Sequence, residues 1–186
     1  MSKITLEHIR MAFGEKTIFS DLSLSFSIPG QYAILGPSGR GKTTLLRLIA
    51  GLEKPLSGRI SLPADKRICF CFQEDRLLPW KTVLENIMLV CSDPEKARFW
   101  LDQVGLAGEE TSYPHTLSGG MKRRASLARA LAYDAEILLM DEPFRALDEQ
   151  THAQMLALVR RAAENKLLIL VTHDEADAEG MQIVRI

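Results

Sequence analysis

The chain has 186 residues, of which 46% are hydrophobic and 25% are charged, and its formal net charge at pH 7 is −1. These values fit one globular domain with a sizeable core, and the balanced charge argues against a nucleic-acid partner bound through an overall basic surface. The longest apolar runs are too short to span a bilayer, and the opening residues, MSKITLEHIR, lack a signal-peptide core, so we expect a soluble, cytoplasmic protein.

The first part of the chain predicts strands and one helix. Residues 3–13 (KITLEHIRMAF) and 22–28 (LSLSFSI) alternate apolar and polar side chains, as half-buried antiparallel strands do. Residues 32–35 (YAIL) form a short apolar run that a glycine ends, which predicts a buried strand. Leucines and an isoleucine within residues 45–49 then predict a helix.

Two further strands are expected at residues 58–62 (GRISL) and 67–72 (RICFCF). The chain has three cysteines, Cys69, Cys71 and Cys91, and this odd, low count argues against a disulfide framework. Cys69 and Cys71 have the spacing of a metal pair, but no third ligand lies near them in the sequence. The pattern favours two small buried side chains over a metal site.

The middle of the chain has the pattern of helices. Thr82 and Glu85 have the spacing of a capping box, and we expect helices near residues 82–91 and 94–104. Residues 119–132 (GGMKRRASLARALA) also predict a helix. These helices interrupt the alternation of strands and helices, so we interpret about residues 74–132 as a helical insert.

The last part of the chain alternates between the two element types. Residues 136–140 (EILLM) and 167–172 (LLILVT) are almost wholly apolar, as strands buried in a parallel sheet are. Between them, Met155, Leu158 and Val159 repeat with the spacing of one helix face. The sequence therefore predicts an α/β fold with a mainly parallel core sheet and an N-terminal antiparallel part.

Residues 36–43 (GPSGRGKT) fit the phosphate-loop pattern G-x-x-x-x-G-K-[ST], between a predicted strand and a predicted helix. Glycines let successive backbone N–H groups point at one anion, and the helix presents its positive end to that anion. Lys42 is then placed for β- and γ-phosphates, and the Thr43 hydroxyl for Mg²⁺. These residues leave kinases, GTPases and ATPases open.

An acidic pair, Asp141 and Glu142, closes the strand in ILLMDEP. A carboxylate at the end of a neighbouring strand is what a P-loop enzyme uses for Mg²⁺, and we assign this role to Asp141, acting through water. Glu142 is placed to act as general base on a hydrolytic water. A solvated acidic turn is the alternative.

The segment LSGGM, residues 117–121, offers a second anion site in the same chain. Ser118 can cap the next helix, and Gly119 and Gly120 expose backbone N–H groups at its start. Taken alone, this is an ordinary capped helix. In combination with the other motifs, the chain resembles the ATP-binding cassette (ABC) ATPase family, whose signature LSGGQ is similar to LSGGM.

The resemblance covers nearly the whole chain and implies one ABC ATPase domain over residues 1–186, with ATP and Mg²⁺ as its ligands. Phe13 matches the aromatic residue that stacks on adenine, with a core phenylalanine as the alternative. The remaining ATP-binding residues that it implies are Gly36, Pro37, Ser38, Gly39, Arg40, Gly41, Lys42, Thr43 and Thr44.

The resemblance also implies roles for three polar residues outside the phosphate loop. Gln73 matches the Q-loop glutamine that senses Mg²⁺ and the γ-phosphate, and His173 matches the switch histidine on the γ-phosphate. Asp148 matches the D-loop aspartate and can also be a helix cap. The implied catalytic set is thus Lys42, Gln73, Glu142 and His173, with plain surface or strand-end positions as alternatives for Gln73 and His173.

In the family, the signature of one chain completes the ATP site of another. We therefore expect a homodimer that forms on ATP, in which Ser118, Gly119, Gly120 and Met121 act on the partner's ATP. The expected product of ATP binding is a closing motion.

The segment FQEDRLLPWKTVLENIML, residues 72–89, closely resembles importer ATPases of the nitrate, sulfonate and taurine group. This implies an ATPase at the inner face of the cell membrane that drives integral membrane permease subunits, with a substrate-binding protein, to import a small organic anion. Leu77, Leu78, Pro79 and Trp80 are candidates for the permease contact. Packing within the helical insert is their alternative role.

The chain departs from the family pattern in three places. The segment between Gly58 and Gln73 is compressed, Arg145 stands where a small residue is usual, and the C-terminal part after His173 is short, so we expect it to lack further sheet elements. A non-transport ABC ATPase, for example of the cell-division type, is the rival function. A P-loop kinase is a second rival, against which LSGGM and Glu142 favour water as the phosphate acceptor.

Overall fold

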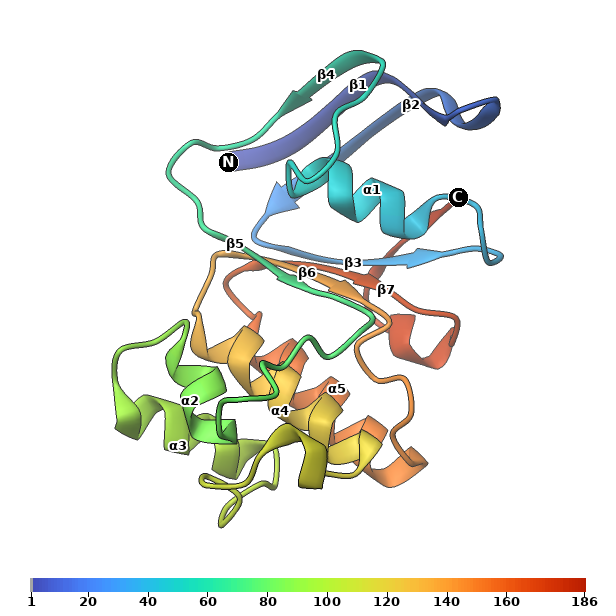
Figure 1. The fold of residues 1–186 in the computed structure, drawn as a ribbon. Helices are drawn as coiled ribbons and strands as arrows, with labels where there is room; N and C mark the ends of the chain where they lie inside the picture. The colour runs from blue at the N-terminus through green and yellow to red at the C-terminus, as the bar shows by residue number, and fades with distance from the viewer. Residues whose placement is uncertain (1) are drawn as a thin grey trace.

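The computed structural model describes residues 2–186, which form layers that Figure 1 shows from top to bottom. The top layer is an antiparallel sheet of β1 (Ser2–Phe13), β2 (Lys16–Ile28) and β4 (Ser57–Ser61), in the order β2-β1-β4. The predicted alternation is confirmed here, because one face of β1 is buried while its other face is exposed.

The central layer is a parallel sheet in the order β5-β6-β7-β3-β8. Its strands are β3 (Gly30–Leu35), β5 (Ile68–Cys71), β6 (Ile137–Asp141), β7 (Leu167–Val171) and β8 (Gln182–Arg185). Every residue of β6 and β7 is buried, as the apolar runs predict. Because these strands run in parallel, the loops that follow β3, β5, β6 and β7 meet at one edge.

Helix α1 (Lys42–Ile49) lies between the two sheets. Its apolar side chains, Leu45, Leu46, Leu48 and Ile49, are buried in a core that also contains Phe26 of β2 and Ile169 of β7. Burying each such side chain contributes about 1.5–3 kcal/mol, so this core anchors the start of α1 firmly against the sheet.

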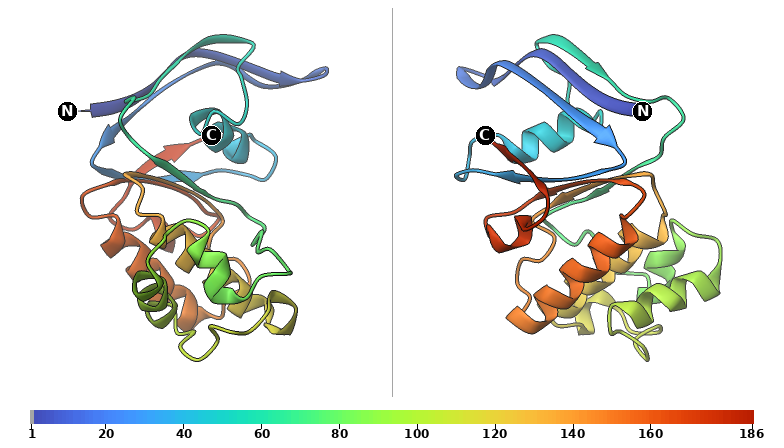
Figure 2. Two further views of the ribbon diagram at one scale, coloured as in Figure 1. Left: turned by 60° about the vertical axis from the view of Figure 1, so that its left-hand side comes forward. Right: turned by 180° about the vertical axis from the view of Figure 1, so that it is seen from behind.

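Four helices cover the opposite face of the central sheet, and the additional views in Figure 2 show the same layering. They are α2 (Val83–Met88), α3 (Pro94–Gln103), α4 (Gly119–Ala132) and α5 (Glu149–Ala162), with single 3-10 turns at η1 (Pro114–Thr116) and η2 (Ala176–Ala178). Ile87 and Leu101 share one buried cluster with Leu138 and Leu168 of the sheet. The predicted capping box of Thr82 and Glu85 is present. Within residues 2–186, no helix is long and apolar enough to cross a membrane.

The cysteines are buried or half-buried free thiols. Burial raises the pKa of Cys69 to about 12, so its thiol is protonated at neutral pH. No group of three or more metal-ligating side chains occurs in the described residues. The prediction of a small buried side chain is confirmed for Cys71, whereas Cys69 is half-buried.

One expectation about the C-terminal part is wrong. Residues after His173 do add a sheet element, because β8 pairs in parallel with β3 from Tyr32↔Gln182 to Leu35↔Arg185. The sequence pattern does not reveal this strand, since β8 is a short edge strand whose Ile183 is exposed on the surface. Because Ile183 faces the solvent, the apolar residues of this segment do not show the alternation that identifies a half-buried strand.

Asn86 of α2 organises the loop before its own helix. Its amide nitrogen donates to the carbonyl oxygens of Leu78, Lys81 and Thr82 at 3.1, 3.1 and 2.9 Å, and its amide oxygen accepts from the Leu78 N–H at 2.7 Å. The side chain is fully buried, so these bonds replace all of its contacts with water. The amide fixes the loop that presents Trp80.

We predict that Asn86→Asp lowers the free energy of unfolding by at least about 2 kcal/mol. The aspartate carboxylate has no N–H group to donate, so the three carbonyl oxygens that now accept from the Asn86 amide would lose this partner and face a negative charge. Urea unfolding measures this loss. The matched control is Asn165→Asp in the exposed turn after α5, for which we expect a change within about 0.5 kcal/mol. Equal losses in the two variants would contradict the assigned role of Asn86.

Candidate functional site

The loop between β3 and α1 curls because its glycines adopt backbone angles that other residues avoid. Gly39 has φ +76° and Gly41 has φ +100°. A Cβ atom on Gly41 would lie 2.5 Å from Cγ2 of Ile18, so the position also lacks space for a side chain. Gly41 is the N-cap of α1 without a capping side chain, which leaves the first N–H groups of the helix to a ligand.

The side chain of Lys42 lies across this loop. Its ammonium group donates to the carbonyl oxygens of Gly36 and Pro37 at 2.7 and 3.0 Å, and the residue is 5% exposed. A buried cation that is bonded only to neutral carbonyls favours an anion as an additional partner. The loop and the helix end therefore make a strong anion site.

A hollow of about 430 Å³ opens beside Lys42, and most of the predicted ligand residues line it. Its lining consists of Phe13, Lys16, Ile18, Ser38, Gly39, Gly41, Lys42, Thr43, Thr44, Gln73, Glu142 and His173. Phe13, at the end of β1, is 48% exposed, so the alternative of a core phenylalanine is wrong. Its ring is available to a flat partner at the mouth of the hollow.

Asp141, the last residue of β6, is 2% exposed, and its Oδ1 atom has no hydrogen-bond partner within residues 2–186. Burial raises the pKa of this carboxyl, the negative charge of Glu142 adds to the effect, and the Thr43 hydroxyl opposes it. A buried carboxylate oxygen without a partner, next to a hydroxyl, is a donor set that suits a hard divalent cation. These residues therefore fit Mg²⁺, which usually takes one or two carboxylates together with phosphate oxygens.

Glu142 is the centre of a second cluster of polar side chains. Its carboxylate accepts a hydrogen bond from the Gln73 side-chain nitrogen at 3.1 Å and pairs with Nε2 of His173. Gln73, Glu142 and His173 follow β5, β6 and β7, and the parallel order brings them together. The backbone of Glu142 has φ +46°, a strained conformation that is often found at functional positions.

The signature residues lie at the start of α4, and neither Ser118 nor Gly119 is among the lining of the hollow beside Lys42. Ser118 caps α4 by accepting from the Met121 N–H at 3.2 Å. Gly119 lines a second hollow of about 320 Å³, together with Gln73, Glu74, Asp75, Arg123, Arg145 and Ala146. The two predicted anion sites of the chain thus face different hollows.

Asp148 caps α5, because its carboxylate accepts from the Thr151 N–H at 2.9 Å. This bond lowers the pKa of the Asp148 carboxyl. The capping role that the sequence offered for Asp148 is confirmed.

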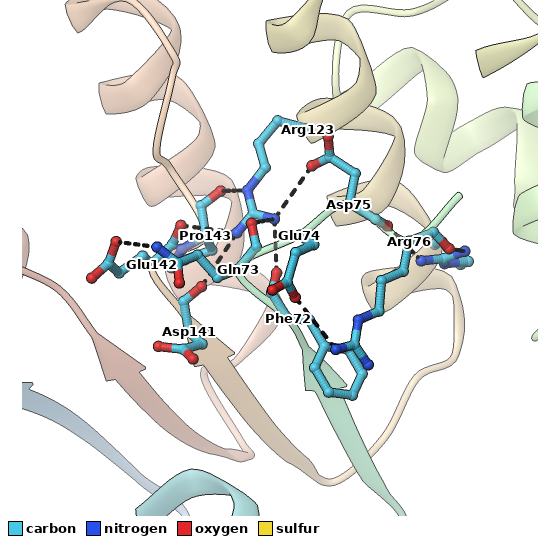
Figure 3. A network of polar contacts seen from close by, with 10 residues as sticks. Phe72, Gln73, Glu74, Asp75, Arg76, Arg123, Asp141, Glu142 and Pro143 are labelled. Atoms are coloured by element: carbon cyan, nitrogen blue, oxygen red, sulfur yellow. Dashed lines mark hydrogen bonds and ion pairs between the residues drawn. The ribbon is translucent and has the colours of Figure 1, made fainter. Parts of the chain in front are cut away.

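Sequence reasoning missed two polar groups that hold the site. The carboxylate of Asp177 is buried, accepts from the Thr172 hydroxyl and pairs with His152 at 2.6 Å, which anchors the segment that carries His173. The second group is the guanidinium of Arg123, which contacts the loop after β5 at Phe72 and the loop after β6 at Glu142 (Figure 3). The sequence gives no signal for either, because Arg123 stands between Lys122 and Arg124, and Asp177 lies in the acidic run of residues 174–179.

Comparison with known proteins gives a consistent result. The family model described as "ABC transporter" matches residues 19–145. The aliphatic sulfonates import ATP-binding protein SsuB of Granulibacter bethesdensis is 47% identical and covers 94% of this chain and 75% of its own length. SsuB 2 of Streptomyces avermitilis is 42% identical, over 94% of this chain and 72% of its own length.

Two solved structures are also similar to this chain. The dimeric structure of MJ0796, described as a bacterial ABC transporter cassette, has a TM-score of 0.88 and 29% identity, and covers 98% of this chain and 94% of its own. A second dimeric structure of the same cassette, in a post-hydrolysis state bound to ADP and Pi, has a TM-score of 0.87 and 28% identity, with the same coverage.

Proposed function

Since the chain belongs to the ABC transporter family, we propose that it is the ATP-hydrolysing subunit of an importer for a small organic anion, such as an aliphatic sulfonate, taurine or a nitrate-like solute. The names of its relatives support this class of solute. The observation that carries the proposal is the meeting of Gln73, Glu142 and His173 beside the buried ammonium of Lys42.

In this proposal, the phosphate loop and Lys42 bind the β- and γ-phosphates of ATP, and Phe13 stacks on the adenine. Mg²⁺ would be held by the Thr43 hydroxyl, the Gln73 side chain and, through water, Asp141. When bound, Mg²⁺ would neutralise charge on the phosphates. The free oxygen of Asp141 and its closeness to Thr43 support this assignment.

Glu142 acts as the general base for hydrolysis. Its carboxylate accepts a proton from water as the water oxygen bonds to the γ-phosphorus, and the bond from that phosphorus to the β–γ bridging oxygen breaks. ADP and phosphate are the products. Gln73 and His173 hold the carboxylate in place, and His173 is then available to donate to the γ-phosphate.

A second copy of the chain completes each site. Ser118, Gly119, Gly120 and Met121 are proposed to act on a partner's ATP, with Asp148 near the contact. Gly119 lines a hollow other than the one beside Lys42, which supports this assignment. A twofold arrangement closes this exchange as a dimer with two equal sites. The dimeric state of the MJ0796 cassette supports the same arrangement.

The permease is proposed to dock beside the Q-loop, which places the chain at the inner face of the cell membrane, with a substrate-binding protein on the far side. Trp80 is 70% exposed at the end of the segment that begins at Leu77. Exposed aromatic side chains are typical of protein interfaces, which supports a docking role for Trp80. In this proposal residues 74–132 act as the helical subdomain within one ATPase domain over residues 1–186.

We predict that Glu142→Gln lowers ATP turnover by at least about 100-fold while ATP binding persists, because only the base is lost. Lys42→Ala should lose turnover together with ATP affinity. Phosphate release and binding of a fluorescent ATP analogue measure the two effects. Glu149→Gln, an exposed carboxylate on α5, is the matched control and should keep normal turnover. Turnover near the wild-type rate in Glu142→Gln would remove the assigned role.

We predict that the Glu142→Gln variant dimerises in ATP and Mg²⁺, because bound ATP joins the two copies and is not consumed. Light scattering should report twice the monomer mass with ATP and the monomer mass with ADP. A monomer under both conditions would contradict an ATP-dependent dimer of the isolated subunit.

We predict that Trp80→Ala keeps intrinsic ATP turnover but loses stable association with the permease subunits of its transporter. Co-purification of the co-expressed subunits from detergent measures the association. Phe99→Ala is the control, since Phe99 is also exposed but lies on α3. If both variants co-purify equally well, Trp80 is not part of the docking surface.

A further inference from the structure

Arg123 of α4 is a buried cation at the centre of the polar network in Figure 3. It is 2% exposed, and its guanidinium bonds to two separate loops. Nη1 donates to the carbonyl oxygens of Phe72 and Gln73 at 2.8 and 3.2 Å. Nε donates to the Pro143 carbonyl oxygen at 2.6 Å, and Nη2 to that of Glu142 at 2.8 Å.

The two loops that this guanidinium joins carry the Gln73 and Glu142 side chains. Those side chains meet at 3.1 Å on the side of the loops that faces the hollow beside Lys42. The guanidinium bonds to their main-chain carbonyls. Arg123 therefore fixes the distance between the loop after β5 and the loop after β6. That distance in turn determines how far apart the Gln73 and Glu142 side chains lie.

The backbone at Glu142 needs an external restraint. Its φ of +46° is unfavourable for a residue with a side chain and persists only where surrounding contacts enforce it. The carbonyl oxygens of Asp141, Glu142 and Pro143 all accept from Arg123, at 3.4, 2.8 and 2.6 Å. The guanidinium thus restrains the strained turn at Glu142 through three hydrogen bonds to its backbone carbonyls.

The chemistry of the contacts requires arginine. Donors that point in several directions within one plane reach both loops at once, whereas the ammonium of lysine is a single point charge. Among residues 2–186, the guanidinium forms an ion pair only with Asp75, whose Oδ1 lies 3.4 Å from Nη1. Most of the bonding therefore goes to neutral carbonyls, which serve to fix loop geometry.

We propose that Arg123 is a positioning residue for ATP hydrolysis: it sets the placement of Glu142 and Gln73 without touching the nucleotide. This rests on the proposed function of Glu142 as general base. A small error in the position of a base can reduce the rate about 100-fold without weakening substrate binding. The phosphate loop lies between β3 and α1, and within residues 2–186 it makes no hydrogen bond to Arg123, so ATP affinity should not depend on the guanidinium.

The test compares Arg123→Lys with Arg124→Lys. The neighbouring Arg124 also donates to two carbonyl oxygens, those of Val104 and Gly105 at 2.7 Å each, but these lie at the end of α3. We expect kcat to fall roughly tenfold to 100-fold in Arg123→Lys, with ATP affinity within about threefold of wild type. Arg124→Lys should keep both values. Turnover within about threefold of wild type in folded Arg123→Lys would overturn the proposal, as would an equal loss of turnover and ATP affinity.

Hydrogen exchange without nucleotide gives a readout that does not depend on activity. In Arg123→Lys, amide protection should fall in residues 72–75 and 141–145, and in Arg124→Lys it should fall only near residue 105. Protection that is unchanged in the first two segments would overturn the proposal. If Arg123→Lys does not fold, Arg123→Gln, which buries no charge, is tested by the same criteria.

Different results would overturn the role of Glu142 and the role of Arg123. An inactive wild-type chain, or normal turnover in Glu142→Gln, would remove the proposed base and with it the basis for this inference. An active wild type, an inactive Glu142→Gln and a fully active Arg123→Lys would overturn only the role of Arg123.

Discussion

Parallel pairing in the central sheet is the constraint from which the site follows. The register places Ile34 of β3 and Asp141 of β6 opposite Val171 of β7, and Met140 opposite Cys71 of β5. Four strands therefore end at nearly one level. The residues that come directly after those ends are the phosphate loop, Gln73, Glu142 and His173. A slip of one residue in any strand would turn its side chains to the other face and separate these groups.

Three charged side chains are buried at or beside the site, in a core that is otherwise mainly apolar. Lys42, Arg123 and Asp141 are all buried, and the two cations bond mostly to backbone carbonyls, while one oxygen of Asp141 has no partner in the described chain. Burying charge with incomplete pairing is unfavourable, and the apolar cores around α1 and around α4 stabilise the fold against that cost. A bound phosphate would complete the pairing of Lys42, and a bound cation that of Asp141, whereas Arg123 is already paired by the carbonyl oxygens of the two loops.

Sequence patterns predicted the features that depend only on residues close together along the chain. The phosphate loop, the apolar strands β6 and β7, and the caps at Thr82, Ser118 and Asp148 all depend on neighbours within a few residues. The edge strand β8 could not be predicted, because its burial pattern has no clear alternation. Arg123 was hidden for another reason, since its partners lie 18 to 51 residues away along the chain. Only the folded arrangement brings those carbonyls to one guanidinium.

Helix α4 contributes Gly119 and Arg123 to the hollow that lies next to the signature. It begins with the signature glycines, carries Arg123 one turn later, and packs its later turns, including Ala128 and Leu131, into the core beneath the sheet. In the proposed dimer a partner's phosphate would contact Gly119, at the start of the helix that also carries Arg123. The guanidinium of Arg123 bonds to the carbonyl oxygens of Gln73 and Glu142, and these two residues also line the hollow beside Lys42. A displacement of α4 would therefore reach the chain's own ATP site through these loops.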